Sequence, residues 1–156
     1  GYSLARKVLF EDAGLECETV PDGMSESVGD ALLRPHYCYW PCINRALSLG
    51  VGIKGMAHIT GGGWFDNIKR ILPADTHVVC EAGVLPVPPI MRLIQEKGNI
   101  ETAEMHRVFN MGMGMAWIVP AESAEAAIAC CDQEGVLAKI VGEVVFGEQS
   151  VELRDA

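Results

Sequence analysis

The chain has no apolar run that approaches the ~20 residues needed for a membrane-spanning helix. No signal peptide is visible either, because Arg6 and Lys7 lead into a segment of mixed polarity. Lysine and arginine number 12 against 21 aspartates and glutamates, which gives a formal net charge of −9. Phosphate backbones are bound by clustered basic side chains, so this composition argues against nucleic acid as a partner. We therefore expect a cytoplasmic protein that binds neither membrane nor nucleic acid.

Cysteine pairs with metal-binding spacing are also missing. Cysteines occur at positions 17, 38, 42, 80, 130 and 131, and no two of them form a C-x-x-C pair. This spacing does not fit a structural zinc centre, so we expect no metal site from it. Reduced and partly buried thiols, as in a cytosolic protein, are the better interpretation.

What the sequence does have is an ordinary globular composition, 49% hydrophobic and 21% charged. It begins with Gly1 rather than Met, which suggests a segment of a longer protein. The alternation of expected elements predicts an α/β fold, one layered domain over residues 1–156 with a mixed β-sheet flanked by helices. The expected helices are 3–12, 27–33, 42–49, 64–72, 88–97, 101–106 and 121–134, and the expected strands are 54–59, 76–80, 108–119, 138–146 and 150–154.

The segment that most strongly indicates a ligand site is AHITGGGWFDNIKRIL, residues 57–72. Its glycines follow an expected strand and open an expected helix, where bare backbone lets a phosphate approach unpaired amides. His58 and Thr60 stand two residues apart at the strand end and are expected on one face. The segment matches neither a Walker loop nor a dinucleotide fingerprint, so a tight turn without a ligand stays open as the alternative. A lone histidine on a strand is also more often structural than functional.

A second unusual segment is EMHRVFNMGMGM, residues 104–115, in which methionines alternate with glycines. In a strand this alternation puts the methionines on one face and bare backbone on the other. The glycine face then carries either a closely packed element or a ligand. For a ligand, Asn110 stands at the edge of that face, and Arg107 is a bidentate donor for a phosphate.

Taken in order, several segments resemble the C-terminal domain of the aminoimidazole ribonucleotide synthetase family. AHITGGG, followed by Asn67, Ile68 and Arg70, is similar to the family's glycine-rich signature, and EMHRVFNMGMGM is similar to its second signature. The segments GYSLARKVL at 1–9, VPPI at 87–90 and IVGEV at 140–144 also fit. Together the matches span nearly the whole chain.

The resemblance implies the C-terminal half of a two-domain enzyme, with each half built of a sheet and helices. The implied reaction converts formylglycinamidine ribonucleotide and ATP into aminoimidazole ribonucleotide, ADP and phosphate, a step of purine (IMP) biosynthesis. ATP and Mg²⁺ are the implied cofactors, with most of their ligands expected in an N-terminal half that lies outside this sequence. The implied partners are that N-terminal domain and a second copy in a homodimer, and the domain alone is expected to be inactive.

One stretch, PHYCYWPC at 35–42, departs from the family pattern. His36 and Tyr37 stand where the family usually has threonine and arginine, and Pro41 replaces a lysine. The loss of two basic residues implies altered substrate binding, or a stretch that packs against another element. Two alternatives stay open for the function: a sister ATP-dependent synthetase or kinase of the superfamily, and a non-catalytic domain used for binding or assembly.

The sequence hypothesis for the site centres on the glycine turn. A phosphate is expected at the amides of Gly61, Gly62 and Gly63, and Thr60, Asn67 and Arg70 support the loop or the ligand. Arg107 and Asn110 are expected as a second wall of the same pocket, and His58 is the candidate catalytic residue. We also expect Gly62→Val to abolish activity while it leaves the fold intact.

Overall fold

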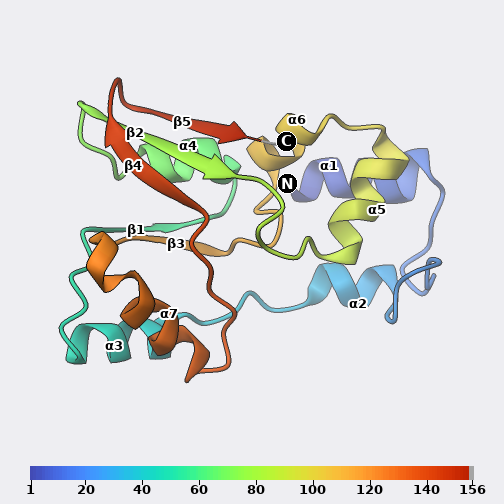
Figure 1. Ribbon diagram of the computed structural model, residues 1–156. Coiled ribbons are helices and arrows are strands. Elements are labelled where there is room, and N and C mark those ends of the chain that lie inside the picture. The colour runs from blue at the N-terminus through green and yellow to red at the C-terminus, as the bar shows by residue number, and fades with distance from the viewer. Residues whose placement is uncertain (155–156) are drawn as a thin grey trace.

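The computed structural model describes residues 1–154, and its strands form two small β-sheets flanked by helices (Figure 1). In the first sheet, β1 (Gly55–His58) pairs antiparallel with β3 (Met115–Ile118). In the second sheet, β2 (Thr76–Glu81) runs antiparallel to β4 (Gly142–Phe146) and parallel to β5 (Ser150–Arg154). The expected layered α/β fold with a mixed sheet is confirmed. The strands divide between two sheets instead of forming one.

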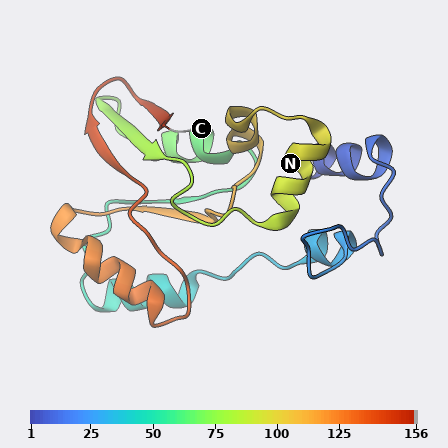
Figure 2. The same ribbon diagram turned by 45° about the vertical axis from the view of Figure 1, so that its right-hand side comes forward.

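Helices surround the sheets in three groups, each with its own apolar cluster. α4 (Gly63–Lys69) packs between the two sheets. One end of the molecule is built from α1 (Tyr2–Arg6), its π-helical continuation η1 (Lys7–Asp12), α2 (Val28–Leu33), α5 (Pro89–Gly98) and α6 (Thr102–Val108) (Figures 1 and 2). The opposite end is built from α3 (Trp40–Ser48), the 3₁₀ turn η2 (Ala121–Ser123) and α7 (Ala124–Asp132).

The two-stranded sheet is covered on both faces, because its side chains alternate between two clusters. Ala57 of β1 belongs to the cluster with α4, together with Trp64 and Ile68. Trp117 of β3 packs instead against the cluster formed by α3 and α7. β1 is therefore held from two sides at the point where it runs into the glycine turn. No helix within residues 1–154 is long and apolar enough to cross a membrane.

The expected strand 108–119 is wrong over its first part. α6 continues through Val108, and the Met113 amide then donates to the Asn110 carbonyl at 2.9 Å, which closes a turn. Met111 (φ 47) and Gly112 (φ 96) both have left-handed backbone, which a strand does not allow. Met111 and Met113 are buried in different clusters, so the methionines do not share one face. The methionine–glycine alternation marks a tight turn that leads into β3.

Candidate functional site

The glycine-rich segment forms a tight turn between β1 and α4. The Gly63 amide donates to the Thr60 carbonyl at 3.0 Å, and Gly62 (φ 96, ψ −4) has the backbone required at the third position of a type II turn. The Gly63 amide is therefore already bonded within the protein. Within residues 1–154, the Gly61 and Gly62 amides donate no hydrogen bond, and the space around the Gly61 α-carbon is open. Two of the three expected anion donors thus stay available.

Gly63 serves packing rather than an anion. Its backbone is left-handed (φ 55), and a Cβ there would overlap the His106 carbonyl oxygen of α6. Only a glycine lets the start of α4 approach the end of α6 this closely. At Gly62 a Cβ would lie 2.9 Å from the Asp66 carboxylate, again with positive φ. Valine at position 62 would strain this backbone, which argues against the expectation that Gly62→Val leaves the fold intact.

The Asn67 side chain stabilises the glycine turn through hydrogen bonds to its carbonyl groups. The side chain is buried, and its amide nitrogen donates to the carbonyls of Gly63 at 2.8 Å, Gly61 at 3.2 Å and Thr60 at 3.4 Å. The Thr60 hydroxyl in turn donates to the Asn67 amide oxygen at 3.4 Å. Of the two roles expected for Asn67, support of the loop is the one that the geometry provides. Its amide protons face carbonyl oxygens of the turn.

The structure brings the second wall to the glycine turn. The Trp64 indole N–H donates to the Asn110 carbonyl at 2.8 Å, and the Asn110 side chain accepts from the Gly112 amide at 3.1 Å. The Arg107 guanidinium lies over the Phe65 ring, 5.4 Å from its centroid, and 3.4 Å from Glu104. Arg107 is largely exposed, so its guanidinium remains accessible to a ligand.

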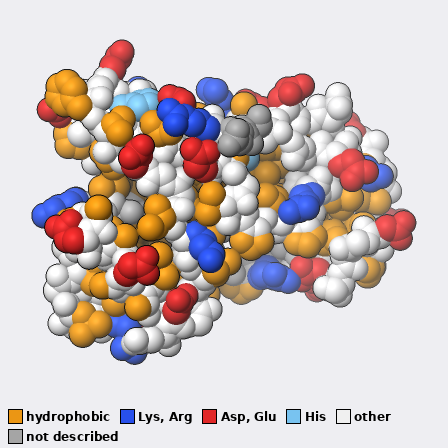
Figure 3. Space-filling view, in the orientation of Figure 1, with side chains coloured by type: hydrophobic (Ala, Val, Ile, Leu, Met, Phe, Trp, Pro, Cys, Tyr) orange, Lys and Arg blue, Asp and Glu red, His pale blue; other side chains and the backbone are white. Residues whose placement is uncertain are grey.

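Arg70 lies away from this group. It caps the C-terminal end of α4, roughly 10 Å along the helix axis from Gly63 at a rise of about 1.5 Å per residue. The Arg70 backbone therefore stands at the end of α4 that is farther from the glycine turn. On the face shown in Figure 3, Lys and Arg side chains are scattered among Asp and Glu and form no continuous basic patch.

His58 ends β1 and faces the departing stretch 35–42. Its Nε2 lies 3.3 Å from the Nε2 of His36, and the two rings meet edge to face with centroids 4.7 Å apart. The Tyr39 hydroxyl and the His36 ring occupy the space where a Cβ at Gly114 would stand. The stretch thus packs against β1 and against the start of β3. This bears out the expectation that it contacts another element, and it explains Gly114 as a close approach.

Sequence reasoning missed His36 and Tyr39 as members of the site. The departure of 35–42 from the family pattern was the available signal, but no periodicity relates residue 36 to residue 58. Thr60, expected on the same face as His58, lies beyond the last residue of β1, and its hydroxyl faces Asn67 instead.

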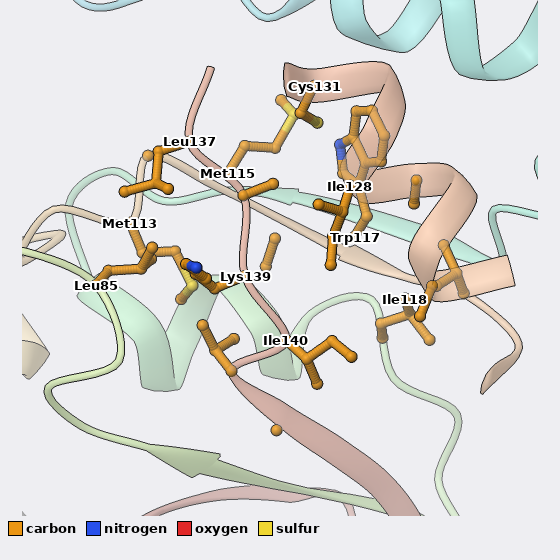
Figure 4. A pocket seen from close by; sticks show the side chains of 18 of the residues that line it. Leu85, Met113, Met115, Trp117, Ile118, Ile128, Cys131, Leu137, Lys139 and Ile140 are labelled. Atoms are coloured by element: carbon orange, nitrogen blue, oxygen red, sulfur yellow. The ribbon is translucent and has the colours of Figure 1, made fainter. Parts of the chain in front are cut away.

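An apolar cleft of about 810 Å³ runs between β3, α7 and the segment 135–144 (Figure 4). Its walls carry Met113, Met115 and Ile140, and Lys139 and Glu143 are its charged lining residues. Two thiols also line it. Burial raises the pKa of Cys80 to about 11 and that of Cys131 to about 12, so both stay neutral near pH 7. The cleft therefore carries no activated thiol nucleophile.

The fold and the turn together define an α/β domain that presents bare backbone amides between a sheet and a short helix. The chain belongs to the family of AIR synthase related proteins, C-terminal domain, which matches residues 1–154. It is 40% identical over 153 residues to the phosphoribosylformylglycinamidine cyclo-ligase of Alkaliphilus metalliredigens, covering 98% of this chain and 44% of the relative. The corresponding cyclo-ligase of Caldicellulosiruptor bescii is 41% identical over 155 residues, covering 99% of this chain and 45% of the relative. The chain thus spans less than half the length of these relatives.

A solved structure supports the fold independently. The crystal structure of E. coli HypE, a hydrogenase maturation protein, matches 75% of this chain and 36% of its own chain with a TM-score of 0.58. The sequence identity is 22%, so the likeness concerns the fold alone.

Proposed function

We propose that this domain takes part, within a full-length protein, in the ATP-dependent ring closure of formylglycinamidine ribonucleotide to aminoimidazole ribonucleotide. The observation that carries this proposal is an identity of about 40% over 98% of the chain to a protein named for that cyclo-ligase reaction. The proposal includes ATP and Mg²⁺, an N-terminal domain of the same protein, a homodimer and a cytoplasmic location.

This reaction requires a protein that positions the two substrates and stabilises the negative charge of the phosphate groups. ATP phosphorylates the amide oxygen of the substrate, the amidine nitrogen attacks that carbon, and phosphate leaves as the imidazole ring closes. Phosphate groups are therefore present throughout the reaction. The free amides of Gly61 and Gly62 are suited to a phosphate oxygen, and the exposed Arg107 is suited to a second one. His58, exposed at the end of β1, is the candidate for moving a proton.

Among residues 1–154, no group of three or more His, Cys, Asp or Glu side chains is placed to hold a metal ion by itself. Mg²⁺ beside a nucleotide is usually held by one or two carboxylates together with substrate phosphates and water. We propose that these carboxylates come from the N-terminal half, and the isolated domain is expected to have no cyclo-ligase activity.

The test is a turnover assay with ATP, Mg²⁺ and formylglycinamidine ribonucleotide, run on the full-length protein and on the 156-residue chain. We expect ADP and aminoimidazole ribonucleotide from the first and neither product from the second. A full-length protein that folds and makes neither product overturns the proposal. ADP formed with a different product from another amide or acid substrate assigns the protein to a sister enzyme.

Gly61→Asp tests the turn itself within the full-length protein. The open space around Gly61 accepts a side chain, and a carboxylate there repels a phosphate. We expect KM for the nucleotide substrate to rise at least tenfold with an unchanged melting temperature, whereas the matched control Gly61→Ala changes KM less than threefold. Equal KM values for the two variants exclude a phosphate at this turn.

A further inference from the structure

We propose that His36 and His58 together bind one divalent first-row transition metal ion, such as Zn²⁺, through their Nε2 atoms. This site shares His58 with the proposed ring closure, and an ion bound at Nε2 occupies the lone pair that would otherwise accept a proton. The site also uses His36, which lies in the stretch where the sequence departs from its family.

The separation of the two nitrogens carries the argument. The Nε2 atoms lie 3.3 Å apart. Zinc–imidazole bonds are about 2.0–2.1 Å long, and two of them at a tetrahedral angle place their nitrogens roughly 3.3 Å apart. The pair is thus already spaced for a shared ion.

The orientation of His36 supports the same conclusion. Its Nδ1 lies 3.2 Å from the Tyr37 carbonyl oxygen. A carbonyl accepts only, so this contact places the ring proton on Nδ1 and leaves a lone pair on Nε2, toward His58. A hydrogen bond from the distal ring nitrogen to a carbonyl is the usual support of a metal-bound histidine.

The surroundings suit an open and exchangeable site. Both imidazoles are exposed, so an ion reaches them from solvent. Tyr39 packs edge to face against the His36 ring with centroids 5.7 Å apart. No third His, Cys, Asp or Glu within residues 1–154 completes the site, so water or an anion fills the remaining positions.

The alternative is a single proton shared between the two rings, since 3.3 Å also permits a weak N–H···N hydrogen bond. A metal site takes up an added transition metal ion, whereas a pair of rings that shares a proton is not expected to do so. Two imidazole ligands favour Cu²⁺ over Ni²⁺ and Zn²⁺, and Zn²⁺ over Mn²⁺. A site of this kind therefore discriminates strongly against Mg²⁺.

The experiment is calorimetric titration of the EDTA-treated, reduced protein with Zn²⁺, repeated with His36→Thr and His58→Gln. We expect one Zn²⁺ per chain, at least tenfold weaker binding in either variant, and no binding of Mg²⁺ at the same concentration. His77→Gln is the matched control, because His77 lies in β2 beside Ser150 and Glu152, and it should leave Zn²⁺ binding unchanged.

Two further measurements keep the proposal falsifiable. Cys38→Ser distinguishes the imidazole site from binding by a nearby exposed thiol, and it should keep full affinity. Circular dichroism of each variant shows whether the fold is retained. Zn²⁺ affinity that is unchanged in His36→Thr overturns the proposal, as does affinity lost only in Cys38→Ser. Absence of Zn²⁺ uptake by the folded wild-type protein leaves the shared proton as the explanation.

Discussion

The three glycines of the central turn serve three different physical needs. Gly61 has free space around it, Gly62 needs a left-handed backbone beside Asp66, and Gly63 lets α4 touch α6. A run of glycines in a sequence therefore does not report one function. Gly61 and Gly62 both offer a free amide, and only Gly61 also has open space for an added side chain, so the phosphate proposal is tested at this position.

Gly63→Ala should destabilise the protein far more than Gly61→Ala. The added methyl at 63 overlaps the His106 carbonyl and sits on a positive φ. Overpacking costs about 1–3 kcal/mol and the left-handed backbone about 1–2 kcal/mol, so we expect a loss of about 3 kcal/mol or an unfolded protein. Urea denaturation followed by circular dichroism measures both variants. Similar free energies of unfolding for the two variants contradict the close approach of α4 and α6.

Asn67→Asp should weaken the turn at one residue without a change of size. The variant replaces an amide that donates to three carbonyls with a carboxylate that repels them. A buried acceptor left without its donor costs about 1–3 kcal/mol, and we expect a loss of stability near 2 kcal/mol at pH 7. Asn44→Asp on the exposed side of α3 is the control, with an expected change below about 0.5 kcal/mol. The prediction fails when both variants melt at the same temperature.

At the scale of elements, α4 joins the parts that form the site. Its seven residues contact both sheets and α6, and its Trp64 also reaches the turn that follows α6. A helix this short has little stability of its own, so its position depends on those contacts. Both signature segments of the sequence meet at α4. The two segments are distant in the chain, and the packing of α4 brings them into contact.

Trp64→Phe tests this junction. The indole is 2% exposed and donates to the Asn110 carbonyl at 2.8 Å. Phenylalanine keeps part of the packing but leaves the carbonyl without that donor and a small void, for which we expect a cost of about 2 kcal/mol. Trp40→Phe is the control, since Trp40 is 62% exposed and should change stability by less than about 0.5 kcal/mol. Thermal unfolding of both variants measures the difference, and equal destabilisation argues against the junction.

At the scale of the whole molecule, buried thiols make the free energy of unfolding depend on pH in the alkaline range. Burial raises the pKa of Cys80 from 9.0 to about 11 and that of Cys131 from 9.0 to about 12. A pKa that is raised on folding gives stability that is fully present below pH 9 and is lost as pH rises toward the folded-state pKa. The free energy of unfolding should therefore fall between pH 9 and pH 11.

The control for this prediction is Cys80→Ala combined with Cys131→Ala. The acidic chain also repels itself as its lysines lose charge, so some decline remains in any variant. Guanidinium titrations at pH 8, 9, 10 and 11 should show a shallower decline in the double variant than in the wild type. Parallel curves show that the two thiols do not contribute.

The sequence by itself determined the order of the elements and the position of the glycine turn. These depend on local chemistry: apolar periodicity marks most helices and strands, and glycine marks backbone that turns sharply. It also identified two segments, around 57–72 and 104–115, that the structure places side by side through Trp64 and Gly63. The elements and the turn depend on interactions within a few residues, and the two segments were identified by their glycines and by resemblance to a family.

Only the tertiary structure decided what each of those residues contacts. It turned the supposed strand at 108–114 into a helix end and a turn, because the glycines and the packing of α6 on α4 outweigh an alternating pattern. It placed the Arg70 backbone at the far end of α4, directed the Asn67 side chain toward the turn, and set His36 against His58. In the chain, α3 and the rest of β1 lie between the two histidines. Their contact exists because the stretch 35–42 packs against the end of β1 and against Gly114, and local sequence carries no record of such long-range packing.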